Sequence, residues 1–242
     1  MELYRRIEHG ISKGLEGTCK DAIMFNGSFD SEVKPEYLIT MNISKAISDL
    51  NYLPGSPFII KPEESTKAFA TRCVPGFKLE DIFSFIPRSL QNTERNGRLD
   101  IAIYNEDKEK PLTAIEVKLL NPRKDDIEDD VIRLSELLHL SDQSTGNSKV
   151  EHTYFACIEM SEKVKFEGQV MCHRKEVQDK YKSYLQEIFS SKTNTKFEVA
   201  SLSIDDSFIL TPEKVTGEEI FDGDQYSYAK HLIGVIVRLT KN

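Results

Sequence analysis

The sequence predicts an α/β fold with a central mixed sheet flanked by helices. Two observations predict it. Segments of helical period alternate with segments of strand period, and 39% of the 242 residues are hydrophobic, which is enough for a packed core. The length favours one domain over two. We expect residues 1–33 to be an N-terminal extension, with a short helix and a loop, and residues 34–242 to form a single domain.

The domain is predicted to begin with a helix over Lys34–Leu50, where Pro35 suits the first turn. One face of this helix is apolar at helical spacing, with Ile39, Ile43, Ala46, Ile47 and Leu50. A turn then leads to a short strand around Phe58–Ile60. The next segment, 62–97, is long for a connection between strands and is predicted to be an insertion.

Two strands over Arg98–Tyr104 and Leu112–Leu120 are predicted to form a hairpin, with the polar segment NEDKEKP as its turn. Alternation gives each strand one aliphatic face and one face with ionisable groups. The ionisable faces contain Arg98, Asp100 and Ala102 in the first strand and Ala114, Glu116, Lys118 and Leu120 in the second. In such a hairpin Asp100 and Glu116 lie close together.

The rest of the chain continues the alternation of helices and strands. A helix with an acidic start, which suits the helix dipole, follows Asn121-Pro122. Residues 205–224 hold seven acids and one base and are expected to be an irregular acidic excursion. The predicted elements are a helix over Asp125–Leu140, a strand over His152–Met160, a helix over Arg174–Ser190, and strands over Phe197–Ile204 and His231–Leu239.

Charge and apolar pattern exclude several classes of protein. The net charge of −8 argues against a generally basic nucleic-acid coat. The acidic excursion carries −6 of it, so the remainder is nearly neutral and leaves room for a local basic cleft. The longest strongly apolar stretch, Leu232–Val237, is far shorter than a membrane span, and the start resembles no secretory signal. Four scattered cysteines suggest reduced thiols. We therefore expect a soluble, cytoplasmic protein.

Asp100, Glu116 and Lys118 form a pattern that suits a metal-dependent phosphodiester hydrolase. Two carboxylates can hold Mg²⁺ or Mn²⁺, which prefer oxygen ligands. Such a metal lowers the pKa of a bound water and stabilises charge on phosphoryl oxygens. The lysine orients that water or helps to deprotonate it, and it offsets the repulsion between the acids. The spacing also arises by chance in charged chains, so a solvated strand face is the alternative.

The segments RNGRLDIAIYN and PLTAIEVKLL resemble the PD-(D/E)xK nuclease superfamily, also called restriction-endonuclease-like. The resemblance covers roughly Lys34 to Met160 and implies a core of a helix, a three-stranded meander, a second helix and a strand. Leu99 stands where the family name implies proline, but many members carry R-x-D, which residues 98–100 match. The implied metal-associated groups are Asp100, Glu116, the backbone carbonyl of Val117 and Glu36, and the implied catalytic lysine is Lys118.

Several charged residues near the implied site have two interpretations. Glu36 either accompanies the metal or only complements its helix dipole. Four bases are candidates for contacts to backbone phosphates, namely Arg98, Arg123, Lys124 and Arg133. The alternative for Arg133 is a local ion pair with Asp129 or Asp130 on its own helix. The alternative for the other bases is simple solvation.

The resemblance implies a Mg²⁺- or Mn²⁺-dependent nuclease that acts on DNA more readily than on RNA, in a setting such as restriction or antiviral defence. Cleavage of both strands in this family commonly uses two active sites, so we expect a homodimer or a partner protein subunit. Two other hypotheses stay open. The chain could be a catalytically silent nuclease-fold scaffold of a larger complex, or an unrelated α/β domain in which Asp100 and Glu116 do not converge.

Overall fold

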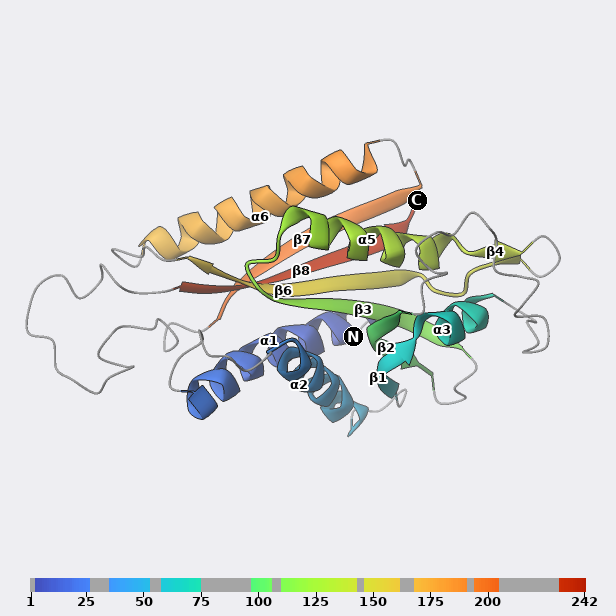
Figure 1. The fold of residues 1–242 in the computed structure, drawn as a ribbon, viewed down its shortest axis with the longest axis horizontal. Coiled ribbons are helices and arrows are strands. Elements are labelled where there is room, and N and C mark those ends of the chain that lie inside the picture. The colour runs from blue at the N-terminus through green and yellow to red at the C-terminus, as the bar shows by residue number, and fades with distance from the viewer. Residues whose placement is uncertain are drawn as a thin grey trace, which may run out of the picture.

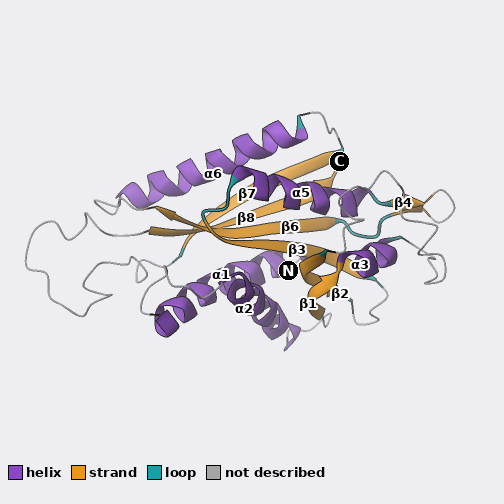
Figure 2. Ribbon diagram, viewed as in Figure 1, coloured by secondary structure: helices purple, strands orange, loops and turns teal. Residues whose placement is uncertain are grey.

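A computed structural model describes residues 3–26, 35–52, 58–74, 97–105, 110–142, 146–161, 168–190, 194–204 and 231–242. It has a six-stranded mixed sheet with helices on both faces (Figures 1 and 2), which confirms the predicted α/β class. The helices are α1 (Leu3–Asn26), α2 (Pro35–Asp49), η1 (Leu50–Tyr52), α3 (Thr66–Cys73), α5 (Lys124–His139) and α6 (Gly168–Phe189). The strands are β1 (Ile59–Ser65), β2 (Arg98–Tyr104), β3 (Pro111–Leu120), β4 (Ser141–Asp142), β5 (Gly146–Asn147), β6 (His152–Ser161), β7 (Thr195–Ser203) and β8 (His231–Lys241).

The strand order in the large sheet is β1-β2-β3-β6-β8-β7. Neighbours pair antiparallel except β3 and β6, which run parallel. Parallel neighbours need a crossover connection, and α5 provides it. The predicted hairpin is therefore present as β2 and β3, and α5, which follows it, lies over β6, β8 and β3 (Figure 1).

Each face of the sheet packs against its own layer of helices. The layer of α5 and α6 covers one face with buried residues such as Leu134, Leu138 and Tyr181. The layer of α1 and α2 covers the other face, and Ile43 and Ile47 of the predicted apolar helix face are fully buried there. Because both faces are covered, the ionisable face of the hairpin is only partly open: Glu116 is buried against α5, Asp100 and Lys118 are half-buried, and Arg98 is exposed.

The extension at residues 1–33 contains a longer helix than its glycine content suggested. Helix α1 spans 24 residues. Its buried side chains follow a spacing of three and four residues, with Ile7, Ile11, Leu15, Cys19 and Ala22. The glycines that hide this period serve close helix contact, because a Cβ at Gly14 would lie 2.4 Å from the Ile43 Cα of α2. The helix is thus part of the folded body that covers the sheet.

Strand β3 contains a bulge directly after Lys118. In the pairing with β6, Lys118 lies opposite Cys157, whereas Leu120 lies opposite Ile158, so β3 has one extra residue at this step. Leu120 therefore packs with the core of the α1 and α2 layer. The expectation that Leu120 shares the face of Glu116 and Lys118 is wrong, because the bulge resets the alternation.

The turn after β3 is held by Asn121. This residue has φ +48°, its backbone N–H donates to the Ile158 carbonyl at 3.0 Å, and its Oδ1 accepts from the Met160 N–H at 2.8 Å. Both bonds join the end of β3 to β6. Asparagine tolerates the left-handed region far better than a β-branched residue does.

We expect Asn121→Val to lower the free energy of unfolding by about 2–3 kcal/mol, because it strains the backbone and removes the side-chain acceptor. Asn121→Gly relieves the strain and loses only that acceptor, so its loss should be about 1 kcal/mol. Urea unfolding of the two variants measures both values. Equal losses would show that the backbone conformation has no part in the effect.

Several predictions concern residues outside the described segments. The acidic excursion at 205–224 lies there entirely, as do residues 75–96 of the predicted insertion. The described beginning of that insertion contains the end of β1 and the short helix α3. No helix in the described segments is both long enough and apolar enough to cross a membrane.

Candidate functional site

The hairpin brings Asp100 and Glu116 together on the face that α5 covers. Ile101 pairs with Ile115, and Ala102 pairs with Ala114, so Asp100 and Glu116 are the next residues beyond the last pair, at the same end of the hairpin. The Asp100 Oδ2 also accepts a hydrogen bond of 2.7 Å from the Val117 backbone N–H. This bond fixes the Asp100 carboxylate across the hairpin, beside the neighbouring strand.

Helix α5 adds a third acid and an arginine, both largely buried. The Arg133 guanidinium lies 2.9 Å from Glu116 Oε1 and 2.5 Å from Asp130 Oδ1. Asp130 Oδ2 lies 3.3 Å from the Lys118 Nζ. Sequence reasoning treated Asp130 only as a helical partner of Arg133. Its spacing of three residues before Arg133 was the available signal, but only the packing of α5 on β3 shows that it also reaches Lys118.

Lys118 lies between acids from both helical layers. Its Nζ lies 3.6 Å from Glu36 Oε1, in the first turn of α2, as well as near Asp130. The Glu36 side chain is 59% exposed, so this contact is weak and screened by solvent. Of the four acids around Lys118 and Arg133, Glu116 and Asp130 are buried, Asp100 is half-buried and Glu36 is exposed.

Burial, and next the nearby Asp100 carboxylate, raise the pKa of Glu116 well above its ordinary value, although Arg133 opposes the shift. Burial also raises the pKa of Asp130, against the effect of Lys118 and Arg133. For Lys118, burial lowers the pKa, but Asp130, Glu36 and Asp100 outweigh it and the net shift is upward. The acids thus keep Lys118 protonated, while their crowding makes negative charge costly at Glu116.

The residues of this site fit a divalent cation in their chemistry. Within the described residues, Glu116 Oε1 and Asp130 Oδ2 are buried and accept no hydrogen bond, although each lies at ion-pair distance from a base. Hard carboxylate oxygens suit Mg²⁺ and Mn²⁺. No group of three or more acid, His or Cys side chains in the described segments is arranged as a ready metal cage. Instead, Lys118 and Arg133 lie between the acids and form ion pairs with them.

The other predicted bases lie around the site without entering it. Arg98 is exposed at the start of β2, and Arg123 is exposed beside Asp126 at 3.1 Å. Lys124 Nζ lies 2.6 Å from Glu187 on α6 and near the ring of Tyr184. Arg133 alone faces the buried acids. It forms the local pair with Asp130, and its contact with Glu116 goes beyond the local interpretation.

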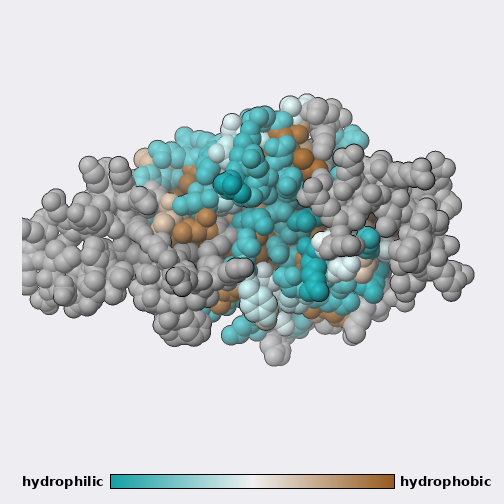
Figure 3. All heavy atoms as spheres, in the orientation of Figure 1, coloured by the Kyte–Doolittle hydropathy of each residue, from teal (hydrophilic) through white to brown (hydrophobic). Residues whose placement is uncertain are grey.

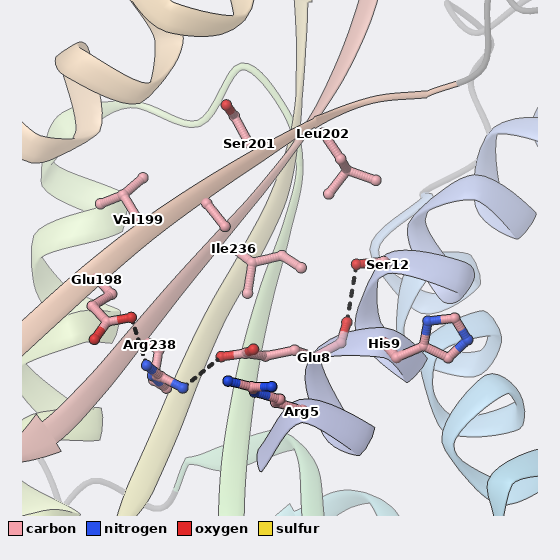
Figure 4. A pocket seen from close by; sticks show the side chains of 11 residues that line it. Arg5, Glu8, His9, Ser12, Glu198, Val199, Ser201, Leu202, Ile236 and Arg238 are labelled. Atoms are coloured by element: carbon pink, nitrogen blue, oxygen red, sulfur yellow. Dashed lines mark hydrogen bonds and ion pairs between the residues drawn. The ribbon is translucent and has the colours of Figure 1, made fainter. Parts of the chain in front are cut away.

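A separate cavity of about 380 Å³ lies on the opposite face, between α1 and the strands β7 and β8 (Figure 4). Its central group is Arg238, whose guanidinium contacts Glu8 and Glu198 at 3.1 and 2.5 Å and lies over the Tyr4 ring. These charges compensate one another. The cavity is structurally independent of the acids under α5.

A scan against protein-family models and searches of curated proteins and of solved structures give no significant match to this chain.

Proposed function

We propose that this protein is a divalent-metal-dependent nuclease with a restriction-endonuclease-like core. The observation that carries the proposal is the convergence of the Asp100 and Glu116 carboxyls beside Lys118 on the hairpin face under α5. In a solvated strand face these groups would be open to water, but Glu116 is only 1% exposed. A buried acid with a second acid beside it is costly for stability, which favours a functional reason for the pair.

The order of elements also supports this core. Helix α2 precedes the antiparallel strands β1, β2 and β3, and α5 then leads to β6 beside β3. This is the sequence of helix, meander, helix and strand that the resemblance implies. Helix α1 adds to this core in the layer of α2, and strands β8 and β7 extend the sheet beyond β6.

Asp100, Glu116 and the Val117 carbonyl would hold Mg²⁺ or Mn²⁺, with Glu36 as an additional acid at the solvent side. The cation, when bound, acidifies a water and stabilises charge on the phosphoryl oxygens. Lys118 is kept protonated by its acidic neighbours, so its first task is to donate to the attacking water or to a phosphoryl oxygen. The hydrogen bond from the Val117 N–H would hold the Asp100 carboxylate in place as a ligand of the cation.

Nucleic acid would approach the site at its solvent side, where Glu36 is exposed and Lys118 is partly exposed. The centre of the face seen in Figure 3, where α5 lies in Figure 1, is mainly hydrophilic. Arg98, Arg123 and Lys124 are placed to contact backbone phosphates there. The number of such bases is small, so we propose that a second copy or a partner subunit supplies further contacts to DNA.

Lys118→Ala is expected to reduce cleavage by about 10²–10⁴-fold while Mg²⁺ binding persists, because the lysine moves or orients a proton and is not a ligand. Initial rates and Mg²⁺ titration by calorimetry measure the two effects separately. Removing a positive charge beside the acids should, if anything, tighten binding of the cation. A loss of Mg²⁺ affinity in this variant would contradict the role assigned to Lys118.

The proposal is tested by cleavage of supercoiled, linear and single-stranded DNA and of RNA, each with Mg²⁺ or Mn²⁺. Metal-dependent cleavage by the wild type and its loss in Lys118→Ala are the expected result. Cleavage that is equal in both proteins would overturn the assignment. If the wild type binds the metal but cuts none of these substrates, the result favours a silent scaffold over a nuclease.

A further inference from the structure

Arg133 occupies a position between two carboxylates that differ in their proposed roles. Its guanidinium contacts Glu116, a proposed metal ligand, and Asp130, which belongs to the same helix as Arg133. Both acids are nearly inaccessible to solvent, and the Arg133 side chain is 18% exposed. Ion pairs in such surroundings are screened little by salt, so they strongly affect any other cation nearby.

We propose that Arg133 is a built-in competitor of the divalent cation, and that it sets the affinity of the site. This inference rests on the proposed function. A guanidinium and a divalent cation on one carboxylate repel each other, so binding of the cation has to displace Arg133 from Glu116. Asp130 then retains the guanidinium, because the pair is three residues apart on α5 and does not depend on Glu116.

The geometry distinguishes a competitor of the cation from two simpler roles for Arg133, a local ion pair and a contact to phosphate. A purely local ion pair would need Asp130 alone, but the guanidinium also reaches across from α5 to β3. A contact dedicated to phosphate would point away from the acids, but here both acids hold it. Competition for Glu116 predicts a change in cation binding without any nucleic acid present, whereas a contact dedicated to phosphate does not.

The test is binding of Mn²⁺ alone, measured by the paramagnetic resonance signal of the free ion. Arg133→Gln should bind Mn²⁺ at least about tenfold more tightly than the wild type. In EDTA the same variant should unfold at a lower temperature, because Glu116 loses its counter-ion, and Mn²⁺ should raise its unfolding temperature by more than it does for the wild type. Lys182→Gln, which removes an exposed charge of α6 that lies 3.9 Å from Asp179, is the control.

The outcomes distinguish the inference from the proposed function. If the wild type binds Mn²⁺ and Arg133→Gln binds it no better than Lys182→Gln does, the competitor role is wrong and the metal site stands. If none of the proteins binds Mn²⁺, the proposed metal site fails and the inference with it. Should Arg133→Gln not fold, Arg133→Lys keeps the charge but loses the guanidinium Nη2 that contacts both acids, and should bind Mn²⁺ with intermediate affinity. An affinity equal to that of the wild type would overturn the inference.

Discussion

Replacing Glu116 by glutamine is expected to abolish Mg²⁺-dependent cleavage, with a loss of roughly a thousandfold or more. The reason is that a cation stabilises the transition state by several kcal/mol, and each 1.36 kcal/mol is about tenfold in rate. Glutamine keeps the shape of the side chain and removes its charge. Mn²⁺ binding should be lost in parallel with cleavage, which a binding isotherm checks directly.

The same substitution should leave the protein more stable in EDTA at neutral pH. Burial and Asp100 raise the pKa of Glu116 in the folded state above the ordinary value of 4.5. The folded state therefore binds more protons than the unfolded state, and its stability falls as pH rises above that ordinary value. Glutamine does not titrate, so the variant escapes this loss.

Thermal unfolding of the wild type and of Glu116→Gln across this pH range measures the effect. The gap between their unfolding temperatures should be widest at neutral pH and close as the pH falls toward 4.5. A variant that unfolds earlier than the wild type at neutral pH would indicate that Glu116 is needed for the fold. Loss of cleavage would then say nothing about metal binding.

Gly14→Ala is expected to lower the free energy of unfolding by about 2–3 kcal/mol, the largest effect we predict for a single methyl group. The added Cβ would lie 2.4 Å from Ile43 Cα and 2.6 Å from Ile43 N, both backbone atoms that cannot move without α2. The two helices must separate, and the buried contacts between them loosen. Urea unfolding measures the change.

Gly17→Ala provides the matched control on the same helix. Its added Cβ would come no closer than 3.4 Å to Asn42 Oδ1, which is an ordinary contact. Alanine is favoured over glycine in a helix by up to about 1 kcal/mol, so this variant should be as stable as the wild type or slightly more stable. A loss equal to that of Gly14→Ala would show that the close contact with Ile43 is not the cause of the destabilisation, because Gly17 lacks that contact.

The sequence alone predicted the parts of the fold that depend on local pattern. The apolar face of α2, the hairpin of β2 and β3, and the crossover helix α5 all have clear periods, and each is present. The same hairpin predicted the approach of Asp100 to Glu116, since register follows from the turn and from the buried rows. Helix α1 was underestimated because Gly10, Gly14 and Gly17 weaken its period, although two of them serve the close contact with α2.

The features that the sequence did not predict depend on contacts between elements that are distant in sequence. Asp130 and Arg133 read as an ordinary pair on a helix surface, because nothing local shows that α5 packs this face onto Glu116. Burial of the ionisable face was missed for the same reason. A single strand pattern cannot reveal whether a second layer covers its polar side.

The bulge in β3 has a consequence for how this strand can vary between related chains. If residues 118–120 followed a regular pleat, Lys118 and Leu120 would point into the same layer, and either an ammonium would enter the apolar core or an isobutyl group would face the acids. Loss of residue 119 would leave Leu120 opposite Ile158, whereas the gain of one residue elsewhere in β3, with no bulge to absorb it, would exchange the two layers from that point on. The bulge is therefore the place in β3 where the loss of one residue disturbs the layers least.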